Sequence, residues 1–112
     1  MARLLVAKIC GAKRVSRSDG EALRHRMEEH WDDVEPMVLD FDGVVIASVS
    51  FFDESFGVLA LRYPLPELTR RFKVENINGP DRQLLNTIVL ARERERAVGP
   101  EGRASTSRPG SQ

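Results

Sequence analysis

The sequence predicts a single α/β domain in which a small sheet, mostly parallel or mixed and of about three to four strands, is covered by about three helices. Two observations lead to this prediction. Short runs of β-branched and apolar residues alternate along the chain with segments of helical periodicity. The length of 112 residues allows one domain with a modest core, and 41% hydrophobic with 30% charged residues is typical of a globular protein.

The first third of the chain is expected to form a strand and then a helix. The apolar run from Arg3 to Ile9 predicts the first strand, which ends before Gly11. Ser18 is followed three residues later by Glu21, which is the pattern of a helix capping box. We therefore expect a helix from about Asp19 to His30.

The middle of the chain contains the predicted central strand. Met37, Val38 and Leu39 are apolar at consecutive positions rather than alternate ones, and Phe41 follows, which is typical of a strand buried on both faces. A turn at Gly43 and a short β-branched run over 44–47 follow. The next helix is predicted to begin near Ser50 and to end at 63–64, and its apolar stripe consists of Phe52, Phe56 and Leu59.

The last third is expected to contain an exposed linker, a strand, a helix and a tail. The linker covers 65–70, the strand 72–77, and the helix follows a turn at 78–80. The core face of this helix consists of Leu84, Leu85, Ile88 and Val89. Residues 98–112 are rich in Gly, Ser and Pro and lack periodicity, so we expect a domain over 1–97 and a disordered tail over 98–112.

The charges are segregated although they cancel. Met1–Arg26 carries a net charge of +5, Met27–Leu61 carries −9 with no basic residue, and Arg62–Gln112 carries +4. A net charge of zero argues against a dedicated binder of nucleic acid or membrane surfaces, so nucleic-acid binding through the basic ends is the weakest functional alternative. The acidic middle between basic flanks predicts ion pairs within the fold.

The chain is poor in groups that catalyse reactions or bind cofactors. Cys10 is its single cysteine, which fits a small buried residue of a protein from a reducing compartment, and no apolar run reaches the roughly 18 residues of a membrane span. His25 and His30 are five residues apart, which is not the spacing of a helical metal pair. The glycines form no phosphate-binding loop. We therefore expect a cytoplasmic protein that is not an enzyme and uses no metal or cofactor.

Two neighbouring motifs are the most informative part of the sequence. Residues 39–44 read Leu-Asp-Phe-Asp-Gly-Val, and 50–56 read Ser-Phe-Phe-Asp-Glu-Ser-Phe. In these motifs the chain resembles the bacterial STAS-like family of small domains, and the likeness extends over about Ile9 to Arg92. The resemblance implies a single STAS-like domain. Its signature and interaction residues are Arg17, Asp40, Ser48, Phe51, Asp53, Glu54 and Phe56.

The STAS-like family is in turn distantly similar to the anti-sigma-factor antagonists, which are switched by phosphorylation of one serine. The resemblance places Ser50 at the phosphorylated position and Ser48 where the antagonists have an aspartate. The residues themselves support a second interpretation, because Ser50 and Asp53 have the spacing of a helix capping box. A related expectation is that Asp53 or Glu54 pairs with Arg17 across neighbouring loops.

The resemblance implies a non-catalytic regulatory domain that binds another protein, such as a histidine-kinase-like ATPase or an anti-sigma factor, in a partner-switching system. The alternative is a sensor of a nucleotide or other small molecule, or an accessory subunit of an enzyme. In that case the ligand would use a pocket at the start of the second helix, formed by Arg17, Ser48, Ser50, Asp53 and Glu54.

Overall fold

A computed structural model describes residues 2–11 and 14–106 of the chain. Its main sheet has three parallel strands in the order β1–β3–β5, with bounds Ala2–Leu5, Met37–Asp40 and Phe72–Glu75. A second, two-stranded parallel sheet pairs β2 (Arg14–Val15) with β4 (Val45–Ile46). This architecture confirms the predicted α/β class.

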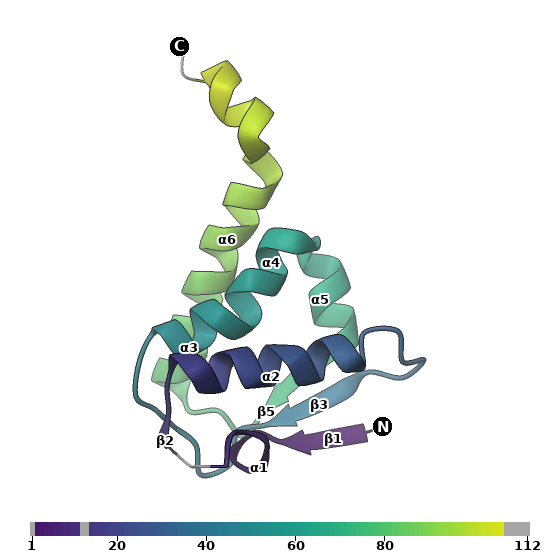
Figure 1. Cartoon of the computed structure of the whole chain (residues 1–112), viewed down its shortest axis with the longest axis vertical. Coiled ribbons are helices and arrows are strands. Elements are labelled where there is room, and N and C mark those ends of the chain that lie inside the picture. The colour runs from purple at the N-terminus through teal and green to yellow at the C-terminus, as the bar shows by residue number, and fades with distance from the viewer. Residues whose placement is uncertain (1, 12–13, 107–112) are drawn as a thin grey trace.

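Helices pack against the main sheet, with α2 lying across it in Figure 1. The helical segments are α1 (Val6–Cys10), α2 (Arg17–Glu29), α3 (Ser50–Phe52), the π-helix η1 (Asp53–Gly57), α4 (Val58–Arg62), α5 (Leu65–Arg71) and α6 (Gly79–Thr106). The segments α3, η1 and α4 follow one another without a break and form the helix that the sequence predicts to begin near Ser50.

The predicted central strand is confirmed as β3, which lies between β1 and β5 and is buried at all four positions. Met37 and Leu39 point into the main core. On the other face, Val38 stands in register between Arg3 of β1 and Lys73 of β5, and it is only 3% exposed.

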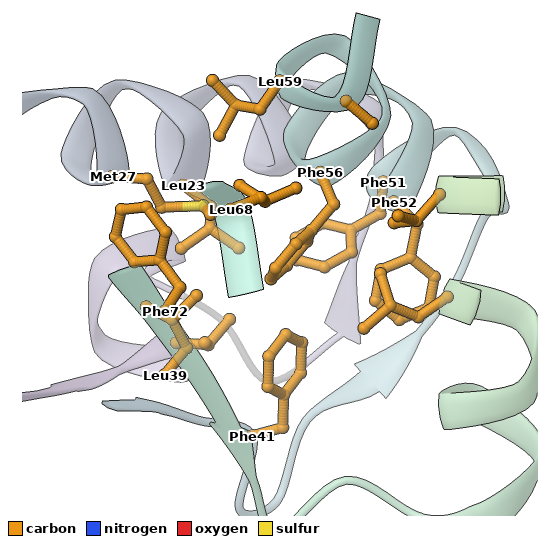
Figure 2. Packing of buried hydrophobic residues seen from close by; sticks show 14 of the residues in the cluster. Leu23, Met27, Leu39, Phe41, Phe51, Phe52, Phe56, Leu59, Leu68 and Phe72 are labelled. Atoms are coloured by element: carbon orange, nitrogen blue, oxygen red, sulfur yellow. The ribbon is translucent and has the colours of Figure 1, made fainter. Parts of the chain in front are cut away.

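The hydrophobic core lies between the sheet and the helices, and aromatic side chains dominate it (Figure 2). Phe51 and Phe52 are fully buried, and their ring centroids are 5.4 Å apart in an edge-on arrangement. Phe41 meets the ring of Phe51 edge-on at 6.3 Å. The stripe of Phe52, Phe56 and Leu59 is buried as predicted.

Two predicted elements at the start of the chain are wrong in their bounds. The strand predicted over Arg3–Ile9 ends at Leu5, and the chain then turns through α1, which is capped by Gly11 in the left-handed conformation at φ 71°. A short apolar run does not distinguish a strand from a buried helical turn. The predicted capping box of Ser18 and Glu21 is replaced by one formed by Ser16 and Asp19, so α2 begins two residues earlier than expected.

The predicted exposed linker is also wrong, because these residues form α5. Leu68 is buried at 3% exposure, and Pro66 lies in the first turn, where its missing N–H costs nothing. Glu67 pairs with Arg70 at 2.7 Å and also with Arg71 one turn later. Such pairs at i+3 and i+4 stabilise a short helix.

The last strand and the last helix differ slightly from expectation. β5 ends at Glu75 because Asn76 has a positive φ of 59°, which an extended strand does not allow. α6 buries Leu85 and Val89 and continues past residue 98, where the predicted tail begins. Residues 107–112 lie outside the described residues, and the division into a domain over 1–97 and a tail over 98–112 stays a prediction.

Candidate functional site

An open cavity of about 520 Å³ lies where the starts of α2 and α3 converge. Its lining consists of Ser16, Arg17, Ser18, Glu21, Ser48, Ser50 and Glu54. Seven polar or charged side chains thus meet at one surface, and they come from two segments about thirty residues apart in the sequence. We refer to this cavity as the serine cavity.

The start of α2 is fixed by local hydrogen bonding. The backbone N–H of Ser16 donates to the carboxylate of Asp19 at 2.9 Å, which closes the first turn. Gly20 follows on the face that meets α3, and its lack of a side chain lets the two helices approach closely. Arg17 and Ser18 are left on the outer face, where they line the serine cavity.

The start of α3 is fixed by two serines. The backbone N–H of Ser50 donates to the Ser48 hydroxyl at 3.2 Å, and the two hydroxyl oxygens are 2.6 Å apart. Ser50 is the first helical residue and its side chain caps nothing, so the capping box predicted for Ser50 and Asp53 is wrong. The carboxylate of Asp53 instead accepts a hydrogen bond from Arg92 of α6 at 2.8 Å.

The predicted ion pair between Arg17 and one of the two helix acids is present, and it uses Glu54. Arg17 Nη2 lies 3.2 Å from Glu54 Oε2, and the Arg17 side chain is 66% exposed. Arg24 approaches the same residue from the buried side, because its Nη1 donates to the backbone carbonyl of Glu54 at 2.7 Å. Glu54 therefore links the N-terminal half of α2 to η1.

Two backbone carbonyl groups in and beside η1 accept hydrogen bonds from side chains. Arg24, whose side chain is only 10% exposed, binds the Glu54 carbonyl, and the buried Ser55 hydroxyl donates to the Phe51 carbonyl at 2.8 Å. At Gly57, an added Cβ would lie 2.9 Å from the Asp53 carboxylate, which explains the glycine inside this helix. Single π turns within α-helices are frequent at functional sites.

The ion pair of Arg17 with Glu54 is expected to add little stability, because solvent screens the exposed guanidinium. A double-mutant cycle of Arg17→Ala and Glu54→Ala, measured by urea unfolding, should give a coupling free energy of about 0.2–1 kcal/mol. The cycle of Arg17→Ala with Asp53→Ala should be additive, since Asp53 pairs with α6 instead. A coupling between Arg17 and Asp53 that equals or exceeds that with Glu54 would contradict this assignment.

A second polar cluster surrounds Asp40 at the end of β3. The Asp40 carboxylate accepts hydrogen bonds from the Asn76 side chain at 2.9 Å, the Asp42 backbone N–H at 2.9 Å and Arg3 at 2.8 Å. These contacts, led by the one from Asn76, hold the pKa of Asp40 below its usual value of about 3.8. None of these residues lines the serine cavity, so the predicted signature residue Asp40 belongs to a separate cluster.

The lowered pKa of Asp40 predicts a pH-dependent contribution to stability. Because the folded-state pKa lies below the unfolded one, this contribution is present above about pH 4 and is lost as the pH falls through the folded-state pKa. The difference in unfolding free energy between the natural chain and Asp40→Asn should be largest near pH 6 and shrink towards pH 2. Urea unfolding at a series of pH values measures this difference. If it stays constant with pH, the charge of Asp40 contributes nothing to stability.

The cysteine and histidines form no reactive centre in the part of the chain that the structure describes. Burial raises the pKa of the Cys10 thiol to about 11, so the thiolate is scarce at neutral pH. His30 contacts Asp33 at 2.8 Å on the surface. Within residues 2–11 and 14–106, no group of three His, Cys, Asp or Glu side chains has the arrangement of a metal site.

The structure brings together some of the sequence-predicted site residues and separates others. Arg17, Ser48, Ser50 and Glu54 share the serine cavity. Asp53 faces α6, and Phe51 and Phe56 are core residues with exposures of 0% and 4%. Sequence reasoning missed Arg24, although its position four residues after Gly20 and three before Met27, both buried, signals that it shares the inner face of α2.

Comparison with known proteins identifies a family. The model of a family described as a STAS-like domain of unknown function matches residues 19–82, which is more than half of the chain. The match includes Ser48, Ser50 and Glu54 and begins two residues after Arg17. No curated protein and no solved structure matches. Among the described residues, no helix is both long and apolar enough to cross a membrane.

Proposed function

The chain belongs to the family of STAS-like domains of unknown function, and we propose that it is a non-catalytic regulatory domain that binds another protein through the surface around the serine cavity. The observation that supports this most is the position of Ser50. Its hydroxyl lies at the rim of an open cavity, beside Ser48 and the ion pair of Arg17 with Glu54.

The surface next to the serine cavity has the composition of a binding site. Val49 is an apolar residue with 56% of its surface exposed. Val49 directly precedes Ser50, so an apolar contact point adjoins the polar cavity. Apolar residues surrounded by polar ones are typical of protein interfaces.

Phosphorylation of Ser50 would change this surface strongly. A phosphate adds a charge of about −1.5 to −2 at the beginning of a helix, where backbone N–H groups and the helix dipole favour an anion. The same charge would repel Glu54 and compete for its partner Arg17. We propose that a histidine-kinase-like ATPase modifies Ser50 and that the modified and unmodified forms bind different partners.

The phosphorylation step is tested with the purified chain, its cognate kinase-like ATPase and ATP. Intact-mass analysis should show the addition of one phosphoryl group to the natural chain and to Ser48→Ala, and none to Ser50→Ala. No addition to the natural chain, or an unchanged addition to Ser50→Ala, would contradict the modification of Ser50. Partner binding without phosphorylation would still be measurable, so the two parts of the proposal are separable.

The alternative function is a sensor of a nucleotide or other small molecule, or an accessory enzyme subunit, that uses the same cavity. Its volume of about 520 Å³ favours this alternative, since ligand pockets span roughly 300–1,000 Å³. Thermal unfolding separates the two functions, because any ligand that binds the folded state raises the melting temperature. Stabilisation by nucleotides alone would favour the sensor, and stabilisation only by a protein would favour the partner-binding domain.

A further inference from the structure

A second cavity, of about 380 Å³, lies between α5, β5 and α6. It is lined by Phe56, Leu65, Leu68, Thr69, Phe72, Lys73, Val74, Arg82, Leu85, Asn86 and Val89. It shares no lining residue with the serine cavity. We call it the α5–α6 groove.

The floor of the α5–α6 groove is the side of the core that is least completely covered. Phe56, Leu68, Phe72, Leu85 and Val89 retain exposures of 3–8%, and all five line the groove. On the α2 side of the core, by contrast, Leu23 and Met27, labelled in Figure 2, are 0% exposed. An apolar ligand in the groove would complete the burial of this side of the core.

Two cationic side chains lie at the groove. Arg82 Nη2 donates to the backbone carbonyl of Val74 at 3.0 Å, and Lys73 Nζ donates to the carbonyl of Thr69 at 3.1 Å. These bonds use only some of the donors of each group. No acidic residue lines the groove, and neither cation forms an ion pair with a residue that the structure describes. The groove therefore combines an apolar floor with uncompensated positive charge.

The edge of β5 argues against addition of a peptide strand in the groove. The Glu75 carbonyl accepts from Phe41 N at 2.9 Å and so faces β3, which means that the preceding carbonyl, that of Val74, faces the free edge. Arg82 already occupies this acceptor. A peptide strand added at this edge would have to displace Arg82 from the Val74 carbonyl.

We propose that the α5–α6 groove binds a small amphiphilic carboxylate, a class that includes alkyl and aryl carboxylic acids. The apolar part lies on Phe72, Leu85 and Val89, and the carboxylate pairs with Arg82 and Lys73. The groove volume lies within the range of small-molecule sites, which are mostly apolar with a few converging polar groups. This site is independent of the function proposed for the serine cavity.

The test uses decanoate as the probe, kept below its micelle concentration, with the full chain in calorimetric and NMR titrations. Decanoate should bind saturably with one equivalent, and chemical shifts should change at Leu85 and Val89. Decanol should bind about tenfold more weakly or worse, because it lacks the charge that Arg82 and Lys73 bind. Decylamine, which carries the opposite charge, should not bind.

Matched variants locate the site. Asn86→Trp places a large side chain at the exposed rim and should abolish binding, whereas Gln83→Trp, on the same helix but outside the groove lining, should not. Arg82→Gln with Lys73→Gln should weaken decanoate binding about tenfold or more, and Arg94→Gln should leave it unchanged. Melting curves establish that each variant is folded.

Several results would overturn the proposal. One is the absence of saturable decanoate binding, and another is equal binding of decanoate and decanol. A third is that Asn86→Trp weakens decanoate binding no more than Gln83→Trp does, or that Arg82→Gln with Lys73→Gln weakens it no more than Arg94→Gln does. Self-association of the chain with chemical-shift changes confined to the groove would also overturn it, since a second copy would then be the occupant.

Discussion

Gly20→Ala is expected to destabilise the domain by about 3 kcal/mol, at the upper end of the usual cost of overpacking. A Cβ at this position would lie 2.3 Å from the carbonyl oxygen of Phe51 and 3.0 Å from its carbonyl carbon. Both are backbone atoms, so no side-chain rotation relieves the overlap. Helices α2 and α3 would have to separate, and the serine cavity between their first turns would change shape with them.

Gly79→Ala is the matched control for this substitution. Gly79 lies at the start of α6, and apart from its own neighbours in the chain nothing lies within 4 Å of the added Cβ. This variant should lose much less stability than Gly20→Ala, because the added Cβ meets no other part of the fold. Urea unfolding measures both variants. Equal effects at positions 20 and 79 would show that α2 and α3 do not meet as closely as described.

Phe51→Ala is expected to cost about 3–5 kcal/mol, the usual range for truncating a fully buried phenylalanine. The ring is 0% exposed and lies edge-on to both Phe41 and Phe52, so its removal leaves a cavity at the centre of the aromatic cluster (Figure 2). Because Phe51 directly follows Ser50, this packing also fixes the position of the proposed phosphorylation site.

Val49→Ala provides the comparison on the other side of Ser50. Val49 is 56% exposed, so its truncation should change the unfolding free energy by no more than about 0.5 kcal/mol. Denaturant unfolding of both variants gives the two values. A loss below about 1 kcal/mol for Phe51→Ala would mean that the ring is not part of a packed core.

The fold was largely predictable because its central elements have strong local patterns. The continuous apolar run of β3 indicated a strand buried on both faces, and the stripe of Phe52, Phe56 and Leu59 indicated a helix packed on the sheet. These patterns depend only on residue spacing. The alternation of strands and helices likewise indicated that β1, β3 and β5 run parallel.

Structural features with short or overlapping sequence signals could not be predicted in the same way. The chain offers two capping patterns two residues apart, Ser16 with Asp19 and Ser18 with Glu21, and the close contact of Gly20 with Phe51 is visible only in three dimensions. The hydrogen bond from Arg24 to the Glu54 carbonyl in the π-helical turn is likewise a tertiary contact.

For the candidate site, the sequence predicted that an ion pair forms but not which acidic residue takes part in it. Charge segregation indicated that basic flanks neutralise the acidic middle, and Arg17 with Glu54 and Arg92 with Asp53 do so. Neighbouring residues on a helix point about 100° apart, so Asp53 and Glu54 cannot both face α2. Which of them faces α2 is decided by the packing of α6, whose placement is not encoded in local sequence.

Photo-crosslinking in the native cell tests most directly whether the surface around the serine cavity binds a protein. A photoreactive amino acid is placed at the exposed Val49, and a matched one at the exposed Arg94 of α6. The proposal predicts a defined protein adduct at position 49 that changes in the Ser50→Asp background, and no such adduct at position 94. The absence of an adduct at position 49, or the same adduct at both positions, would contradict it.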